Sequence, residues 1–216
     1  MAIGDIHGCI STFKWMLFVE LKIQKQDEIY CIGDYIDRGS GSKEVVDIIL
    51  LLREQGYQIN TLRGNHEQIM MESAESFDNL NLWLKNGGDD TLKSFGINSY
   101  ADMPHKYKQF FSDTKFYIAT PDYIFVHAGL NFQKPDIFED KEAMLWTRNF
   151  NPQQPVLGDK ILVHGHTPQS LEFILNQKTN CLNIDGGCVY KTYPHLGNLV
   201  ALNLIDRKFS MVKCMD

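Results

Sequence analysis

The sequence predicts an α/β fold, an αββα sandwich in which a mixed two-sheet core is flanked by helices. Short apolar runs alternate with helical patterns in the first third of the chain, which is typical of βαβ units with parallel strands. Strand patterns dominate the second half, where we expect largely antiparallel pairing. Because the two halves differ in this way, two sheets suit the pattern better than a single doubly wound sheet.

The first third contains three strand patterns and two helix patterns. The strands are Met1–Ile3, Glu28–Ile32 and Tyr57–Leu62. The helices are Ile10–Gln24 and Ser42–Gln55. The first strand is short for a buried strand, whereas both helices carry apolar residues at helical spacing. We expect Ser42 to cap the second helix and Gly56 to end it.

The rest of the chain gives an interrupted helical segment and then further strands. Residues 67–112 have a helical pattern with breaks at Gly87-Gly88 and Gly96, and we expect residues 77–113 to form a helical cap near the site. The predicted strands are Lys115–Ala119, Tyr123–Val126, Lys160–Val163, Leu171–Leu175, Cys181–Ile184, Leu199–Leu204 and Lys208–Val212. We expect residues 1–216 to form a single catalytic domain.

The composition argues against several classes of protein. A net charge of −6 over 216 residues gives the chain no general attraction for nucleic acid. No apolar run approaches the roughly 18 residues of a membrane span, and no signal peptide is visible, so we expect a soluble cytoplasmic protein without a membrane partner. Five cysteines without a CxxC pair are typical of a reducing compartment, where we expect each to fill the core.

Five polar motifs coincide with the ends of predicted strands. They are GDIHG at residues 4–8, GDYIDRG at 33–39, RGNHE at 63–67, VHAG at 126–129 and VHGHTP at 163–168. Each combines a glycine with a carboxylate, an amide or an imidazole, and neighbouring parallel strands bring such loops to one edge of a sheet. These side chains suit a two-metal hydrolytic site, which needs a carboxylate that bridges the ions. They favour Mn, Fe or Zn over Ca.

Each motif also has a purely structural interpretation. GDIHG fits a turn with a capping aspartate, and GDYIDRG fits a loop held by an Asp–Arg pair. GNHE fits a helix start with Asn65 as the cap and Glu67 in the first turn. His127 or His166 alone is more often a hydrogen-bonded core histidine. Together, however, these interpretations require five independent coincidences in order, so the metal site is favoured.

In this order, GDIHG, GDYIDRG and GNHE resemble the signature of the PPP family of metal-dependent phosphatases, which are calcineurin-like metallophosphoesterases. The later HAG and GHTP segments resemble its bacterial and phage branch, typified by lambda phosphatase. The resemblance implies two divalent metal ions, with Mn²⁺ expected and Fe or Zn as alternatives. It implies that Asp5 and His7 hold the first ion, that Asp34 bridges both, and that Asn65, His127 and His166 complete the second.

The resemblance also implies how the site works. A water or hydroxide between the ions would attack phosphorus in line, and His66 would protonate the leaving group as general acid. Asp37 would bind the other imidazole nitrogen of His66 and fix its orientation. Arg38 and Arg148 would hold the phosphate oxygens.

Two assignments depend on short stretches. Arg148 lies in the segment LWTRN, which resembles the family's second phosphate arginine, and a surface arginine is the alternative. Strand alternation puts His164 on the same face as His166, where it would support a metal ligand.

The implied function is phosphomonoester hydrolysis, foremost by a serine/threonine or dual-specificity phosphatase with a phosphorylated protein or peptide as substrate. A symmetric diadenosine tetraphosphatase is the alternative, since it shares the motifs. A catalytically idle metal-binding scaffold ranks third, because every ligand position and the general acid are present. A nucleotide substrate needs additional cations and an aromatic side chain that stacks on adenine. Trp83, Trp146 and Tyr190 are the candidates, although we expect each to pack in the core.

Overall fold

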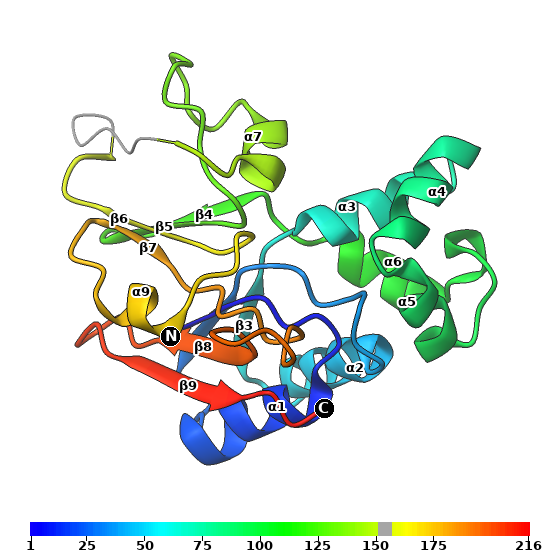
Figure 1. Cartoon of the computed structure of the whole chain (residues 1–216), viewed down its shortest axis with the longest axis horizontal. Helices are drawn as coiled ribbons and strands as arrows, with labels where there is room; N and C mark the ends of the chain where they lie inside the picture. Colours follow the sequence, from blue (N-terminus) through cyan, green and yellow to red (C-terminus); the bar gives the residue numbers. More distant parts are fainter. Residues whose placement is uncertain (151–156) are drawn as a thin grey trace.

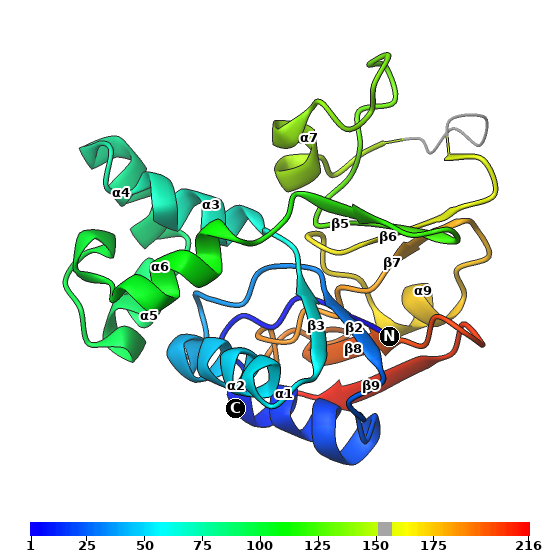
Figure 2. The ribbon, with the colours of Figure 1, turned by 180° about the vertical axis from the view of Figure 1, so that it is seen from behind.

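Two β-sheets lie face to face in the computed structural model, which describes residues 1–150 and 157–216 (Figures 1 and 2). In order across the first sheet, the strands are β3 (Gln58–Thr61), β2 (Glu28–Cys31), β1 (Ala2–Ile3), β8 (Asn198–Leu202) and β9 (Phe209–Lys213). In order across the second sheet, they are β4 (Tyr117–Ala119), β5 (Tyr123–Val126), β6 (Ile161–His164) and β7 (Cys181–Asn183).

Helices cover the outer faces of the two sheets and complete the sandwich (Figure 1). Helix α1 (Ile10–Trp15), its π-helical continuation η1 (Met16–Glu20) and α2 (Ser42–Glu54) lie below the first sheet. Helix α7 (Lys141–Trp146) lies above the second. Between the sheets, the rings of Tyr30 and Phe125 stack with their centroids 4.3 Å apart. The predicted αββα arrangement with mixed sheets is therefore confirmed.

The pairing of the strands differs from the prediction in the second half. In the first sheet, β1, β2 and β3 are parallel, and β8 and β9 add antiparallel strands. In the second sheet β5, β6 and β7 are also parallel, and β4 is the antiparallel edge. The connections from β5 to β6 and from β6 to β7 are long enough for crossovers. The expectation of a largely antiparallel second half therefore holds for β4 with β5 and for β8 with β9, and it was wrong for β5, β6 and β7.

One predicted strand is a helix. Leu171–Leu175 forms the short helix α9, and the hydroxyl of Ser170 caps it by accepting a hydrogen bond from the amide of Phe173 at 3.2 Å. Ile174 is fully buried while Phe173 and Leu175 are about half exposed, so the segment buries one side of a helix. An apolar run of five residues is too short for periodicity to distinguish these two structures.

The helical segment in the middle of the chain packs beside α2 at the right of Figure 1. It consists of α3 (Asn65–Glu72), α4 (Phe77–Lys85), α5 (Gly88–Phe95), the 3₁₀ turn η2 (Tyr100–Asp102) and α6 (His105–Ser112). The predicted breaks are confirmed, since Gly87 separates α4 from α5 at φ +103° and Gly96 ends α5 at φ +65°. Among the described residues, no helix has the length and apolar character that crossing a membrane requires.

Helix α2 ends as predicted but begins differently. Gly56, with φ +88°, follows the last turn and terminates it. Gly41 occupies the N-cap position, whereas Ser42 is the first helical residue. The Ser42 hydroxyl accepts a hydrogen bond from the amide of Asp37 at 3.1 Å. Ser42 therefore supports the loop after β2.

Candidate active site

Six parallel strands from the two sheets end in loops that meet at one place. The loops follow β1, β2, β3, β5, β6 and β7, and five of them carry the motifs identified in the sequence. A pocket of about 90 Å³ lies among them, lined by His7, Asp34, Arg38, Asn65, His66, Arg148 and His166 together with other residues. Asp5, Asp37 and His127 lie directly behind this lining. The structure thus brings all ten predicted site residues together.

The backbone of these loops is held in an unusual conformation. Seven non-glycine residues of the described chain have positive φ. Five of them are predicted site residues: His7 (47°), Asp34 (50°), Asp37 (69°), Arg38 (70°) and His166 (68°). Such conformations cost energy and cluster at functional sites, where the surrounding structure enforces them. Because most of the positive-φ residues lie at this pocket, the conformation of its loops is best explained by a functional role.

Asp34 occupies the position expected of a bridging ligand. Its Oδ2 lies 3.4 Å from Nε2 of His7 on one side and 3.5 Å from Nε2 of His127 on the other. Two groups of possible ligand atoms, each within 4.8 Å of one another, therefore share this carboxylate. His7 and His66 form the first group with Asp34, and His127 and His166 form the second.

The imidazoles are held in the form that binds metals. Nδ1 of His7 donates to the carbonyl of Ile36 at 2.9 Å, and Nδ1 of His127 donates to that of Ile32 at 3.0 Å. In both rings Nε2 is therefore unprotonated, and its lone pair is available on the side of Asp34. Burial lowers the pKa of His7 and His127, and it lowers that of His166 to about 3. All three rings are therefore neutral near pH 7.

Several acceptor atoms converge where the two ions are predicted. Oδ1 of Asn65 lies 2.9 Å from Nδ1 of His166 and 3.0 Å from Nε2 of His127. Oδ1 of Asp5 and Nε2 of His166 are buried without a hydrogen-bond partner in the described part of the chain. Unpaired buried polar atoms are costly, and a cation between such acceptors would relieve the cost. The residues present therefore fit a metal centre.

The carboxyl groups around the pocket also fit bound cations. Burial, with further repulsion from Asp185 and Asp34, raises the pKa of Asp5. Burial raises the pKa of Asp185 to about 7 and that of Glu67 to about 8, and Asp34 adds to both shifts. Such crowding of buried acids disfavours their charged forms, which nearby metal ions would stabilise.

Asp185 lines the pocket but was missed from the sequence. A signal was present, because the stretch IDGG at residues 184–187 follows β7 as the other motifs follow their strands. The Asp185 carboxylate accepts a hydrogen bond from the amide of Gly187 at 2.8 Å, which orders this sixth loop.

Glu67 connects two of the loops. Its carboxylate accepts hydrogen bonds from the amides of Asp34, Tyr35 and Gly64, each at 2.9 Å. It lies in the first turn of α3 as expected, but Gly64 occupies the N-cap and Asn65 is the first helical residue. This change leaves the Asn65 side chain free to face the two histidines.

Two glycines make room for the carboxylates. A Cβ atom on Gly64 would lie 2.1 Å from Oδ1 of Asp34, and one on Gly165 would lie 2.2 Å from Oδ1 of Asp5. Any larger residue would displace a predicted metal ligand. Glycine at these two motif positions therefore has a steric reason.

His66 and Asp37 form a buried pair beside the pocket. Nδ1 of His66 lies 2.6 Å from Oδ2 of Asp37. Asp37 also accepts hydrogen bonds from Oγ1 of Thr91 at 2.6 Å and from Nε1 of Trp83 at 3.0 Å. Trp83 is fully buried, so its expected place in the core is confirmed. Its bond to Asp37, like that of Thr91, could not be read from the sequence, because both residues come from the distant helices α4 and α5.

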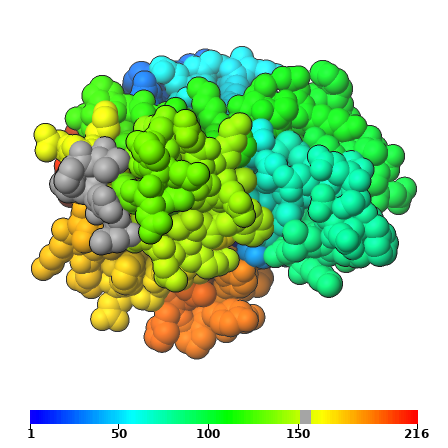
Figure 3. Space-filling model, turned by 90° about the horizontal axis from the view of Figure 1, so that it is seen from above, coloured from blue at the N-terminus to red at the C-terminus, as the bar shows by residue number. Residues whose placement is uncertain are grey.

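The two predicted phosphate ligands differ in their surroundings. Arg38 is partly buried, and its Nη1 donates to Nε2 of His7 at 2.7 Å, the same lone pair that a metal would use. Metal binding to His7 would require this guanidinium to release the ring. Arg148 is exposed at the edge of the pocket. In the view from above, the yellow-green residues near 145 border the cyan to teal residues of the segment near 65–85 (Figure 3).

His164 does not support the metal ligands as strand alternation predicted. It lines a neighbouring cavity of about 610 Å³ that shares Arg148 with the pocket, and its ring contacts that of Phe150 with centroids 5.1 Å apart. His166 lies beyond the end of β6 and has a positive φ, so the alternation of the strand does not reach it.

Comparison with known proteins places the chain in a family. Residues 1–206 match the calcineurin-like phosphoesterases. The chain is 40% identical over 87 residues to serine/threonine-protein phosphatase 1 of Salmonella typhimurium, covering 40% of this chain and 38% of that protein. It is 31% identical over 130 residues to serine/threonine-protein phosphatase 2 of Escherichia coli, covering 56% and 57%. The matches thus span less than two thirds of either relative.

A third relative matches over a greater length. An asymmetrical bis(5′-nucleosyl)-tetraphosphatase PrpE of Geobacillus is 28% identical over an alignment 224 positions long, which covers 87% of this chain and 85% of that protein. Among solved structures, a protein provisionally assigned as a diadenosine tetraphosphatase matches with a TM-score of 0.72 at 19% identity, over 100% of this chain and 93% of that one. The chain belongs to the calcineurin-like phosphoesterases, a family of hydrolases that depend on two metal ions.

Proposed function

We propose that this phosphoesterase hydrolyses phosphate monoesters on proteins or peptides, foremost on serine and threonine. The observation that carries the proposal is the shared carboxylate of Asp34, which joins two groups of possible ligand atoms, one with His7 and His66 and the other with His127 and His166. Asp5, His7 and Asp34 would hold one ion, and Asp34, Asn65, His127 and His166 the other. Mn²⁺ is the first candidate, with Fe or Zn as alternatives. When bound, two such ions neutralise phosphate oxygens and lower the pKa of water.

The chain's own residues would then handle the leaving group and the phosphate. His66 is held by Asp37 through Nδ1, so its Nε2 is the nitrogen available to protonate a departing alkoxide. Arg38 and Arg148 would bind the phosphate oxygens, where a guanidinium can make two parallel hydrogen bonds. Asn86 of the segment at residues 77–113 also lines the pocket, which is consistent with a cap that limits access.

The size and charge of the pocket favour a monoester. Its volume is about 90 Å³, and Arg38 and Arg148 are the only lysine or arginine residues among the described side chains that line it. Besides the two proposed ions, these arginines match the charge of one phosphate group. A chain of four phosphates carries more negative charge and would need further cations along its length.

A specific observation favours dinucleoside tetraphosphates as the second candidate. Trp146 is 38% exposed at the rim of the pocket, and Tyr190 lines it with its ring 5.5 Å from the guanidinium carbon of Arg38. Exposed aromatic rings of this kind can stack on a base. The PrpE protein of Geobacillus, which matches over most of its length, is named for an asymmetrical activity on such nucleotides.

The two candidates are separated by assaying phosphoserine peptides and diadenosine tetraphosphate side by side with Mn²⁺. We expect the larger kcat/KM for the peptides, and we expect Trp146→Ala to leave that value nearly unchanged. A larger kcat/KM for the nucleotide, together with a rise in its KM in Trp146→Ala, would reject the proposal in favour of the second candidate. Activity on both substrates that survives thorough chelation would reject both.

A further inference from the structure

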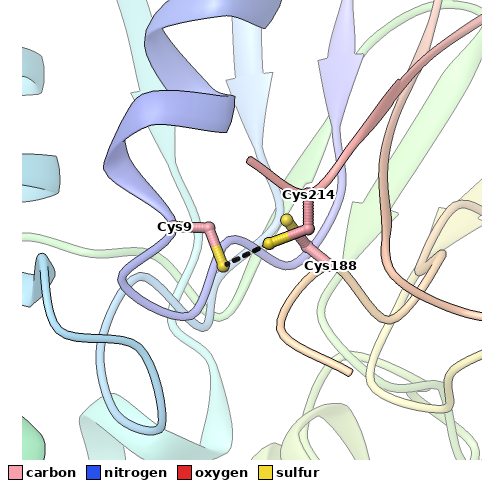
Figure 4. A group of neighbouring side chains, drawn as sticks. All are labelled: Cys9, Cys188 and Cys214. Carbon is pink, nitrogen blue, oxygen red and sulfur yellow. Dashed lines mark hydrogen bonds between the residues drawn. The ribbon is translucent and has the colours of Figure 1, made fainter. Parts of the chain in front are cut away.

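Three cysteines from distant parts of the chain meet in one place (Figure 4). Cys9 directly precedes α1, Cys188 follows the loop after β7, and Cys214 follows β9. Their sulfur atoms all lie within 4.8 Å of one another, and all three are free thiols. Figure 4 shows the side chains of Cys9 and Cys214 directed toward each other, with Cys188 beside them. Such a cluster was not expected from a sequence without a CxxC pair.

The cluster is enclosed on most sides and open on one. Cys9 is 1% exposed and Cys188 is 0% exposed, whereas Cys214 is partly exposed. An ion could therefore enter from the side of Cys214. The sulfurs lie in a largely apolar environment, since Cys9 and Cys188 belong to the main hydrophobic core.

The spacing of the sulfurs suits a single metal ion better than a disulfide. Sγ of Cys9 and Sγ of Cys214 are 3.9 Å apart. Two thiolates on one ion at about 2.3 Å lie roughly 3.8–4.0 Å apart. A disulfide bond measures about 2.05 Å, so forming one here requires the sulfurs to approach by nearly 2 Å.

The segment that carries Cys214 is held in place by other contacts. The amide of Cys214 donates to the carbonyl of Gly197 at 2.8 Å, and the amide of Met215 donates to Oγ1 of Thr12 at 2.9 Å. The Asp216 carboxylate accepts from the amide of Thr12 at 3.0 Å and from its hydroxyl at 2.7 Å. These bonds fix the position of Cys214 beside Cys9 before any ion binds, which lowers the cost of assembling three ligands.

We propose that Cys9, Cys188 and Cys214 form a binding site for one soft, thiophilic metal ion of the Zn²⁺ or Cu(I) kind, separate from the phosphoesterase centre. Thiolates select such ions over the harder ions suited to carboxylates and amides. Binding releases the thiol protons to solvent as the three metal–sulfur bonds form. The ion joins α1, the loop after β7 and the segment after β9, so its role is to stabilise the fold behind the active-site loops.

The test uses the full chain with Asp34→Asn as background, under reducing conditions. Cd²⁺ is titrated in, and the ultraviolet charge-transfer absorption of cadmium–thiolate bonds is followed. We expect saturation at one equivalent per chain and displacement by Zn²⁺. Substitution of a residue that only orients a metal ligand weakens metal binding by about 10–100-fold. Cys188→Ser removes a ligand itself, so we expect it to weaken binding by about 100-fold or more. The matched control is Cys181→Ser, a cysteine outside the cluster, which should bind as the background does.

The readout does not depend on the proposed phosphatase function. Cd²⁺ at the active site would bind nitrogen and oxygen atoms and produce no thiolate absorption. If Cys188→Ser fails to fold, the partly exposed Cys214→Ser gives the same comparison. Absence of the thiolate absorption, or equal absorption in Cys188→Ser or Cys214→Ser and in the control, would overturn the proposal.

Discussion

The predicted acid, His66, is held by residues that lie outside the lining of the pocket. Its partner Asp37 is fully buried, and each of its contacts comes from a different part of the chain. A histidine that is oriented by a buried carboxylate keeps one nitrogen directed at the reacting group. In this pair, His66 would act chemically and Asp37 would position it.

His66→Asn should lower kcat by about 10²–10⁴-fold, the range that general acid catalysis contributes. Its metal content should stay near that of the wild type, because the assigned ligands remain. His105→Asn, at an exposed position outside the site, is the matched control and should behave as the wild type. Loss of both ions in His66→Asn would refute the role as acid, since that result would make the residue a ligand.

Trp83→Phe should lower kcat by about tenfold and leave KM and metal content nearly unchanged. The substitution removes the indole donor to Asp37 but keeps an aromatic ring in the core, and a hydrogen bond to a charged group contributes about 1.5 kcal/mol or more. Trp15→Phe, at a residue that is 47% exposed, provides the control. An unchanged kcat would show that Asp37 is held adequately without the indole.

At the scale of elements, the strands and the polar motifs at their ends could be predicted, whereas contacts between distant segments could not. An apolar run followed by glycine and a polar ligand identified the strands β1, β2, β3, β5 and β6. The candidate ligand residues could be named because the motifs that follow these strands resemble a family signature. Trp83 and Thr91 could not, because their roles arise from contacts between distant segments. The short helix α9 was predicted as a strand because five residues carry too little periodicity.

Helix α1 is capped from the far end of the sequence. The carboxylate of Asp216 accepts hydrogen bonds from the amides of Ser11 and Thr12 at 2.8 and 3.0 Å. Asp216→Ala should therefore lower the free energy of unfolding by about 1 kcal/mol, as measured by urea denaturation at pH 7. Asp122→Ala, at an exposed position, should have little effect.

The effect of Asp216→Ala should also depend on pH. Burial alone would raise the pKa of Asp216, but hydrogen bonds from Thr12 and Ser11 hold that pKa below its usual value. The native state thus binds this proton less readily than the unfolded state does. Its contribution is present above about pH 4, where the unfolded carboxyl is ionised, and is lost as the pH falls through the native pKa. The difference between the variant and the wild type should shrink accordingly, and a constant difference would contradict the cap.

At the scale of the whole molecule, the sandwich brings two parallel sets of strands to one edge. The first sheet supplies Asp5, His7, Asp34 and Asn65, and the second supplies His127 and His166. Ions held between these loops would connect the two sheets. The buried acids Asp5, Asp185 and Glu67, whose pKa values are raised, would then gain a stabilising positive charge.

Chelation should therefore lower the melting temperature, and added Mn²⁺ should restore it. A ligand at 100 times its Kd stabilises a protein by about 2.7 kcal/mol. Since 1 kcal/mol shifts Tm by about 2–4 °C in a chain of this size, we expect a change of several degrees. Asp34→Asn is the control, and its melting temperature should respond little to Mn²⁺. An equal response in both proteins would place the stabilising ion elsewhere.

The most direct test of the central claim is the metal content of wild type and Asp34→Asn, measured together with their phosphatase activity. The shared carboxylate predicts two ions per wild-type chain after loading with Mn²⁺. It also predicts that Asp34→Asn loses metal and activity together, since one residue serves both ions. Two ions retained in Asp34→Asn, or wild-type activity that survives complete chelation, would contradict the account.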